Sequence, residues 1–405
     1  MKARRQRARL GRRLRGFGWP WSRLSREGRA LFSITCAAAV FGIDVGGSQT
    51  HVLLLASLSW IAATLVFSRA YRLTGVRMEL SVPHRVSVGD ELWLDIQLCN
   101  DGAQAHHRIR IEPPLMPHDG QFTRPAAEIE ELLPRARANT LASARFSARG
   151  EHELEAFRAV ALLPLGLSQG PAVRTPGARF MVVPKLAKVV SFATPHQRRQ
   201  QPGGVNRASR TGDATDLLGL RPYRMGDPLR DLSARAWARH GKPMVREYQE
   251  RHFTRFGVIV DTDVSAASPA HLEGALSLGA GIVARLCAGE ALVELLVTGQ
   301  RVEPLFVQPG RSALDQSLDL LAVAASESDF ASARLMGRLV PHLSRLSSLV
   351  FVALGWDEAR AAFVSWIEAR GVRCVVFVVG DEPERSARFT SVSLHAISSG
   401  QEIAL

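Results

Sequence analysis

Polar and apolar residues alternate along much of the chain that follows residue 76. In the run ELWLDIQLCNDG, every second residue from Leu92 to Leu98 is apolar, and the run ends in an Asn-Asp-Gly turn sequence. A period of two is typical of a strand with one buried face. The runs HRIRIEP, LASARFSARGEHELE and ARFMVVP continue this pattern between prolines and glycines. The pattern predicts a β-sandwich-like domain over residues 76–185, in which Trp93 and Phe146 are packing residues.

The pattern changes near residue 255, where continuous apolar runs alternate with runs of helical period. RFGVIVDTD, ALVELLVTG, LSSLVFVALG and VRCVVFVVGD are typical of buried strands, and HLEGALSLGAGIVARL, RSALDQSLDLLAVA and WDEARAAFVSWIEARG of helices. The first helix places these residues on one face: Leu272, Leu276, Gly279, Val283 and Leu286. Strands that alternate with helices indicate a parallel sheet covered on both faces. Residues 255–405 are therefore predicted to form an α/β doubly wound domain.

Two long uncharged runs precede the strands, ALFSITCAAAVFGI and VGGSQTHVLLLASLSWIAATLVFS. A membrane-spanning helix needs about 20 apolar residues, so residues 30–68 predict a two-helix transmembrane hairpin that turns at Asp44-Val-Gly-Gly-Ser48. The same turn resembles the phosphate-binding turn of sugar kinases and actin-like ATPases. That turn joins two short strands, whereas the apolar runs here are long, so the hairpin is the preferred interpretation.

Charge is distributed unevenly, because residues 1–29 carry +10 of the net +13. Basic residues beside a first transmembrane helix are retained in the cytoplasm, and three arginines also follow the second apolar run. We therefore expect a basic cytoplasmic tail over residues 1–29, both termini in the cytoplasm, and lipid headgroups as the partner of the tail. Nucleic acid is not an expected partner. The polar segment 195–212 is predicted to be a linker.

Acidic and hydroxyl side chains follow two of the predicted buried strands. Asp261, Asp263 and Ser265 follow the first strand, and Asp357 follows a later one; Thr298 and Ser312 could supply further oxygens. Mg²⁺ prefers hard oxygen ligands such as these. The turn resembles the metal-ion-dependent adhesion site of von Willebrand factor A domains, with Asp263 in place of a serine. The alternative is that these side chains cap the helices that follow.

The segment DLLGLRPYRMGDPLRDLSARAWARHGKPMVREYQE, within residues 213–250, carries a more specific motif. It resembles the signature of the bacterial "domain of unknown function 58" family: Gly-x-Arg-x-Tyr, a Gly-Asp pair, an arginine, a helix that ends in Ala-Arg, and a Val-x-Glu strand. Ala234 and Trp237 depart from that signature. The order of segments along the chain also resembles the family, which implies a membrane-anchored protein of the bacterial inner membrane with a degenerate von Willebrand factor A-like domain.

The motif's charged residues allow two interpretations. Arg221, Arg230 and Arg239 present forked donors that suit carboxylate or phosphate groups, and Tyr223 lies among them in the sequence. Asp227, followed by Pro228, is predicted to cap a helix. These side chains either lock the segment to its own surroundings or dock an acidic partner.

Three functions are consistent with the sequence. The first is a membrane-anchored interaction or assembly protein; the family resemblance implies a MoxR-type AAA+ ATPase as its companion, with Mg²⁺ at the acidic turn. The second is an enzyme that uses Mg²⁺ for phosphoryl transfer or hydrolysis. The third is a metal-free membrane scaffold.

No catalytic residue is predicted, and the four scattered cysteines show no metal-ligand spacing. The predicted fold class is thus multidomain: a transmembrane hairpin, a β-sandwich-like domain and a von Willebrand factor A-like domain.

Overall fold

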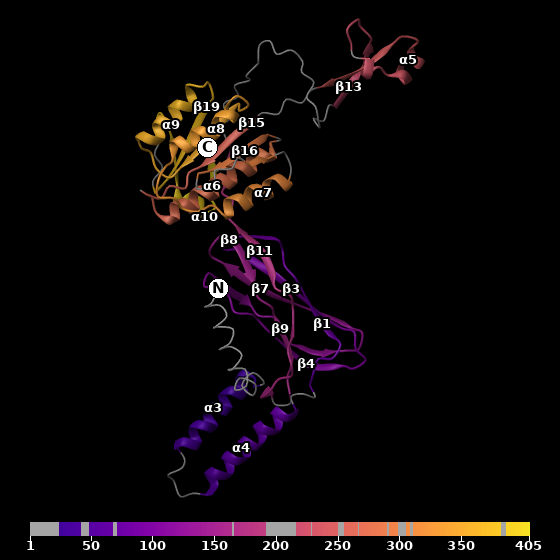
Figure 1. Cartoon of the computed structure of the whole chain (residues 1–405), viewed down its shortest axis with the longest axis vertical. Coiled ribbons are helices and arrows are strands. Elements are labelled where there is room, and N and C mark those ends of the chain that lie inside the picture. The colour runs from indigo at the N-terminus through magenta and orange to yellow at the C-terminus, as the bar shows by residue number, and fades with distance from the viewer. Residues whose placement is uncertain are drawn as a thin grey trace, which may run out of the picture. The chain divides into compact units, whose positions relative to one another are not determined.

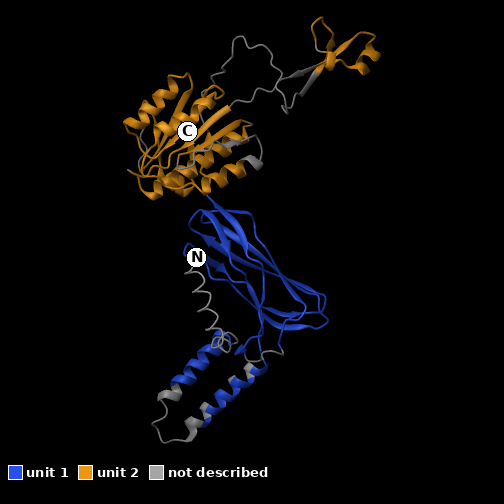
Figure 2. Cartoon of the chain, viewed as in Figure 1, with its two compact units in different colours: residues 1–185 blue, residues 186–405 orange. Residues whose placement is uncertain are grey.

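The structure is a computed structural model that describes residues 24–41, 48–67, 71–163, 166–191, 216–227, 229–249, 255–265, 267–289, 291–298, 305–307, 311–381 and 386–405. The chain divides into two compact units, Met1–Lys185 and Leu186–Leu405 (Figures 1 and 2). The predicted linker 195–212 and most of the predicted basic tail 1–29 lie outside the described residues.

Helices α3 (Arg26–Phe41) and α4 (Ser48–Phe67) occupy the region of the predicted transmembrane hairpin and contact each other (Figure 1). Among the described residues, no helix combines the length and the apolarity needed to cross a membrane. Helix α3 has 16 residues and begins with charged ones, and α4 begins with the polar sequence Ser-Gln-Thr-His. The prediction of a transmembrane hairpin is therefore wrong, and with it the fold class that included one and the two-span inner-membrane localisation.

In the part of unit 1 that the structure describes, eleven strands follow, and all of them lie in three sheets, two of four strands and one of three. The sheets have the orders β1-β3-β7-β5, β10-β9-β4-β6 and β2-β11-β8. The strands are β1 (Val76–Ser81), β2 (Arg85–Ser87), β3 (Glu91–Asn100), β4 (His106–Glu112), β5 (Gly120–Arg124), β6 (Ile129–Leu132), β7 (Arg137–Phe146), β8 (Gly150–Leu154), β9 (Arg158–Ala161), β10 (Val173–Arg174) and β11 (Ala178–Val183). Pairing is antiparallel apart from β2 with β11.

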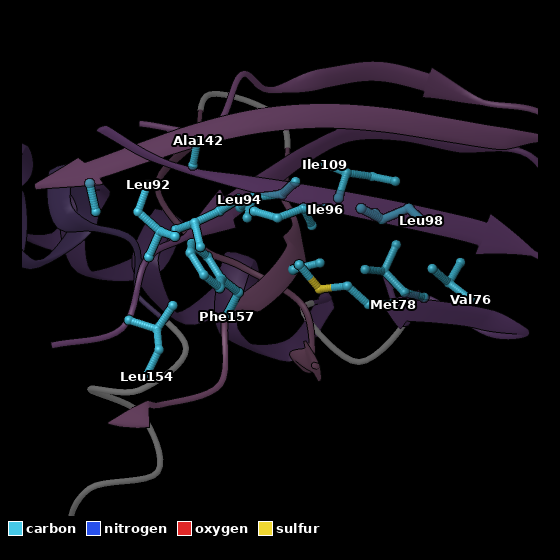
Figure 3. Packing of buried hydrophobic residues seen from close by; sticks show 14 of the residues in the cluster. Val76, Met78, Leu92, Leu94, Ile96, Leu98, Ile109, Ala142, Leu154 and Phe157 are labelled. Carbon is cyan, nitrogen blue, oxygen red and sulfur yellow. The ribbon is translucent and has the colours of Figure 1, made fainter. Parts of the chain in front are cut away.

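Both four-stranded sheets contribute to one apolar core. Figure 3 shows Leu92, Leu94, Ile96 and Leu98 of β3 in that core together with Ile109 of β4, which belongs to the other sheet. The predicted alternation along β3 is confirmed, because each of these four β3 side chains is at most 1% exposed. Phe146 is a core residue as expected, whereas Trp93 is 45% exposed and so does not pack in the core.

Unit 2 contains a six-stranded sheet of order β17-β16-β15-β18-β19-β20. Its strands are β15 (Arg255–Val260), β16 (Leu292–Val297), β17 (Leu305–Val307), β18 (Ser348–Ala353), β19 (Arg373–Gly380) and β20 (Thr390–Ser393). All neighbours pair in parallel except β16 and β17. The predicted buried strands lie where the apolar runs placed them, since such runs fit strands with both faces covered.

Helices cover both faces of this sheet. They are α6 (Pro269–Ala288), α7 (Arg311–Ala322), α8 (Ser332–Leu343), α9 (Glu358–Glu368) and α10 (Leu394–Ser399). A β-carbon at Gly279 of α6 would lie 2.6 Å from Val260 Cγ2, whereas Ile259 packs in the core with residues of α8 and α9. Successive residues of a strand point to opposite faces, so α6 lies on one face and α8 and α9 on the other.

The first and last strands of unit 2 pair with each other. Strand β12 (Lys188–Ser191) pairs in parallel with β21 (Glu402–Ala404), and Leu405 N donates to Ser191 O at 2.9 Å. Between β12 and β15 lies a separate antiparallel hairpin of β13 (Asp216–Pro222) and β14 (Met244–Gln249), joined through the 3₁₀ turn η2 (Leu229–Asp231) and helix α5 (Ala234–His240). We call residues 216–249 the basic hairpin.

Candidate functional site

The strand order brings the predicted acidic residues to one edge of the sheet. The parallel strands in the order β16-β15-β18-β19-β20 are, in chain order, 2-1-3-4-5, and ligands of such sheets bind beyond the strand ends where the order reverses. Asp261 directly follows β15, and Asp357 lies beyond the end of the neighbouring strand β18. The structure therefore brings Asp261, Asp263 and Asp357 together, whereas their role as metal ligands stays a prediction.

A fourth side chain, which the sequence analysis missed, lies between these carboxylates. Arg360 of α9 donates from Nε to Asp261 Oδ2 at 2.8 Å, from Nη2 to Asp263 Oδ2 at 2.9 Å, and from Nη1 to Asp357 Oδ2 at 2.5 Å. Asp261, Asp263 and Arg360 are respectively 0%, 4% and 4% exposed. The guanidinium thus joins the loop after β15 to the start of α9 in a cluster that is buried except at Asp357.

The second oxygen of each carboxylate accepts a hydrogen bond from the backbone. Asp261 Oδ1 accepts from Asp263 N at 3.0 Å, Asp263 Oδ1 from Ser265 N at 2.9 Å, and Asp357 Oδ1 from Arg360 N at 2.8 Å. Each carboxylate therefore accepts from the guanidinium at Oδ2 and from an N–H group at Oδ1, and Asp261 Oδ2 also accepts from Leu354 N at 3.4 Å. Ser265 is exposed, and it hydrogen-bonds to Asp263 through both its backbone N–H and its side chain.

Burial and pairing have opposite effects on the two buried acids. Burial raises the pKa of Asp261 despite the neighbouring Arg360. Burial also disfavours the ionised form of Asp263, but hydrogen bonds from Ser265 and Arg360 outweigh that effect and lower the pKa of Asp263. Burial likewise opposes the charge on Arg360, yet Asp261 and Asp263 raise the pKa of its guanidinium. Arg360 therefore remains charged, and it provides the positive charge that a buried carboxylate requires.

Further contacts close the site on its other sides. Thr298 Oγ1 accepts from Thr262 N at 2.7 Å and lies 3.4 Å from Asp261 Oδ1, so this predicted oxygen is close to the carboxylates. The Arg360 guanidinium carbon lies 4.8 Å from the ring centre of Phe330, within the range of a cation–π contact. Ser312 falls in the first turn of α7, and its side chain lies outside the described residues.

The capping interpretation holds for one of the acids. Asp357 is the N-cap of α9, because its side chain accepts from Arg360 N. Asp261 and Asp263 do not cap α6, whose N-cap is Ser268. In the described part of the chain, no group of three or more His, Cys, Asp or Glu residues is arranged to hold a metal ion. The Mg²⁺-dependent enzyme remains a prediction.

The basic hairpin carries the predicted arginine motif. Arg221 forms a fork to Asp227, from Nη1 to Oδ2 at 2.7 Å and from Nη2 to Oδ1 at 2.8 Å, and Arg224 N donates to Asp227 Oδ2 at 2.8 Å. These bonds lower the pKa of Asp227, with the Arg221 side chain as the largest cause. The prediction that Asp227 caps a helix is wrong for α5, which has Ser233 as its N-cap.

The other predicted residues of the motif lie near the Arg221–Asp227 ion pair, which we call the lock, or on the surface. Tyr223 is half-buried, and its N–H donates to Pro243 O at 2.9 Å, which ties the loop to β14. Arg230 and Arg239 are exposed, and Arg230 Nε lies 3.9 Å from Asp231 Oδ1. Arg221, Tyr223 and Asp227 therefore shape the hairpin, whereas Arg230 and Arg239 are free to meet solvent or a partner.

Comparisons with known proteins identify no family. No family model and no curated protein match the chain. A fragment of Escherichia coli alpha-2-macroglobulin, from domain MG7 to the C-terminus, is 17% identical with a TM-score of 0.23 and covers 28% of this chain and 18% of its own. AvmM, which catalyses macrocyclization in alchivemycin A biosynthesis, is 10% identical with a TM-score of 0.20 and covers 27% and 88%. The alkylpurine DNA glycosylase AlkC of Pseudomonas fluorescens, bound to DNA, is 12% identical with a TM-score of 0.19 and covers 31% and 38%. Likenesses this weak carry no argument about fold or function, so the resemblance to the domain-of-unknown-function-58 family remains a prediction.

Proposed function

We propose that this protein is a binding protein whose basic hairpin docks an acidic surface of a partner protein. The observation that carries this proposal is the combination of exposed apolar and basic side chains on the hairpin. Met225, Leu229 and Trp237 are exposed there. Met, Trp and Arg are enriched at protein interfaces, and Trp and Arg dominate their binding energies.

Charge specifies the kind of partner. Residues 216–249 hold seven Arg and Lys against four Asp and Glu. Arg221 is engaged by Asp227, and the other six basic side chains are exposed: Arg224, Arg230, Arg235, Arg239, Lys242 and Arg246. A basic surface attracts an acidic one and accelerates its association. Exposed Leu and Met favour a protein over a nucleic acid, whose backbone offers charge but little apolar surface.

The lock between Arg221 and Asp227 supports the same function. It holds the loop that contains Met225 between β13 and η2, so the exposed side chains start from a loop that is already ordered. An ordered loop loses less conformational entropy when it binds. The resemblance of this segment to the family signature makes a MoxR-type AAA+ ATPase the partner to test first.

The test measures binding of the full chain to the purified MoxR-type ATPase of the same organism, with single-stranded RNA and DNA as competing probes. The variants Trp237→Asp and Arg239→Glu should each weaken binding to the ATPase at least tenfold, which corresponds to about 1.4 kcal/mol. Leu115→Asp is the matched control for an apolar site, since Leu115 is 86% exposed in unit 1. Arg338→Glu, on the exposed surface of α8, is the control for charge.

Both controls should bind as the unaltered protein does. Equal losses in the controls and the hairpin variants would contradict the proposal, as would binding to RNA or DNA in place of the protein partner.

A further inference from the structure

We infer that Arg360 acts as a built-in cation: its guanidinium takes the place of a divalent metal ion among Asp261, Asp263 and Asp357, so this edge of the sheet requires no metal. This inference concerns a different part of unit 2 from the proposed binding surface, and it stands or falls independently of that proposal.

The first argument is the position of the guanidinium. The three carboxylates come from the loop after β15 and from the N-cap of α9, and they converge on one group. Arg360 contacts them from three different nitrogens, Nε, Nη2 and Nη1. A metal ion bound by these oxygens would link the same two segments. The arginine makes that link through its own side chain.

The second argument is that every oxygen of the three carboxylates already accepts a hydrogen bond. Each Oδ2 accepts from Arg360, and each Oδ1 accepts from a backbone N–H. Asp261 Oδ2 lies within 2.8 Å of both Nε and Nη2, Asp263 Oδ2 accepts from Nη2, and Asp357 Oδ2 accepts from Nη1, so these oxygens lie around the edges of a planar group. Mg²⁺ requires ligands in near-octahedral geometry at about 2.0–2.1 Å, all directed at one point. While the guanidinium is present, it occupies the point on which the three Oδ2 atoms converge, so a divalent cation cannot bind there.

The third argument is that the site is buried except at Asp357. Mg²⁺ usually keeps several of its water molecules when it binds to protein. Asp261 and Asp263 are buried, and Phe330 lies against the guanidinium. Guanidinium is more weakly hydrated than a small cation and stacks on aromatic rings. The buried surroundings therefore suit Arg360 better than a hydrated metal ion.

The inference predicts that removal of the guanidinium turns the cluster into a metal site. The experiment titrates Mn²⁺ and Mg²⁺ into the full chain and records both the heat of binding and the melting temperature. The unaltered protein should show no binding that depends on Asp261. Arg360→Ala should gain Mn²⁺ binding, and its melting temperature should rise with Mn²⁺ concentration. The double variant Arg360→Ala/Asp261→Asn is the matched control and should lose that response.

Two results would overturn the inference. One is Mn²⁺ binding by the unaltered protein that disappears in Asp261→Asn. The other is an Arg360→Ala protein that folds and yet ignores Mn²⁺. If Arg360→Ala does not fold, Arg360→Gln replaces it, because an amide removes the charge and can still donate to a carboxylate. The titration of the unaltered protein decides the first point in either case.

Discussion

Arg360 Nε donates to Asp261 Oδ2 at 2.8 Å, and Arg360 Nη2 lies 2.7 Å from the same oxygen. One carboxylate oxygen thus meets two edges of the guanidinium, inside a region where both side chains are almost inaccessible to water. The pair joins two neighbouring strands through their C-terminal loops. Its removal should therefore destabilise the whole sheet.

Arg360→Met should lower the free energy of unfolding of unit 2 by about 3–5 kcal/mol, because it leaves buried carboxylates without their counter-charge. Arg338→Met places the same substitution on the exposed surface of α8 and should change the free energy by no more than about 0.5 kcal/mol. Amide hydrogen exchange of peptides from β15 and β18 measures both effects. Equal protection in the two variants would contradict the structural role of Arg360.

Two helical glycines should respond oppositely to alanine. At Gly279 of α6 a β-carbon would lie 2.6 Å from Val260 Cγ2, so Gly279→Ala should destabilise by about 1–3 kcal/mol through overpacking. At Gly337 of α8 nothing lies within 4 Å of that position, so Gly337→Ala should stabilise by about 0.5–1 kcal/mol. Urea denaturation compares the two variants. Stabilisation by Gly279→Ala would show that α6 lies farther from β15.

The fork between Arg221 and Asp227 should be visible in a titration. Asp227 has a lowered pKa in the folded protein, so its stabilising contribution is complete above the unfolded pKa and is lost as pH falls through the lowered pKa. In Arg221→Lys the two-pronged fork is lost, and the pKa of Asp227 should move up towards its ordinary value. Carboxyl NMR measures this pKa.

The matched control for this titration is Arg230→Lys, because the carboxylate beside Arg230 is that of Asp231. This variant should leave the pKa of Asp227 unchanged. The fork would be shown to be unimportant if both variants gave the same pKa as the unaltered protein.

Glu294 of β16 is a buried acid whose pKa is raised by burial, although His342, Arg255 and Arg345 oppose the shift. His342 Nδ1 lies 3.4 Å from Glu294 Oε2. The folded protein keeps a proton that the unfolded chain releases, so the free energy of unfolding falls as pH rises from the unfolded to the folded pKa. Glu294→Gln should reduce that decline by up to about 1.4 kcal/mol per pH unit.

The remaining decline in this variant belongs in part to Asp261, whose pKa is also raised by burial. Denaturant unfolding at a series of pH values measures the slope. Glu402→Gln, on the exposed side of β21, is the control and should leave it unaltered. A slope that is the same in Glu294→Gln as in the unaltered protein would refute the assignment.

Local periodicity predicted those elements whose own sequence contains their pattern of burial. In β3 and in α6, the apolar residues lie on the side of the element that is covered. About ten residues of sequence are enough to show which side that is. Elements that depend on distant partners were missed. Strand β17 has three residues and pairs antiparallel with β16. Strand β13 pairs with β14, the expected Val-x-Glu strand, only after an intervening helix.

The acidic cluster shows the same limit. The ends of buried strands located Asp261 and Asp357, because parallel strands end at one edge of the sheet. Arg360 was missed, since an arginine three residues after Asp357 on a helix is normally exposed. One signal was available: helix N-termini carry partial positive charge, so an arginine in the first turn of α9 is unfavourable unless carboxylates compensate for it.

The apolar runs near residues 30–68 misled the prediction for a different reason. A long run without charge predicts membrane insertion, but the uninterrupted apolar part of each helix is shorter than the charge-free run. Helix boundaries, which the sequence did not give, decide this length.

The pairing of β12 with β21 has a mechanical consequence. The chain enters unit 2 at the start of β12 and leaves it at the end of β21, and the two strands run parallel. Tension applied to Ala187 and Leu405 in opposite directions would slide one strand along the other, loading all the hydrogen bonds between them at once. An antiparallel pair pulled from adjacent ends would instead open one bond at a time. The β12–β21 pair therefore resists shear. The basic hairpin lies between β12 and β15 in the sequence, so it carries none of this tension as long as β12 and β21 remain paired.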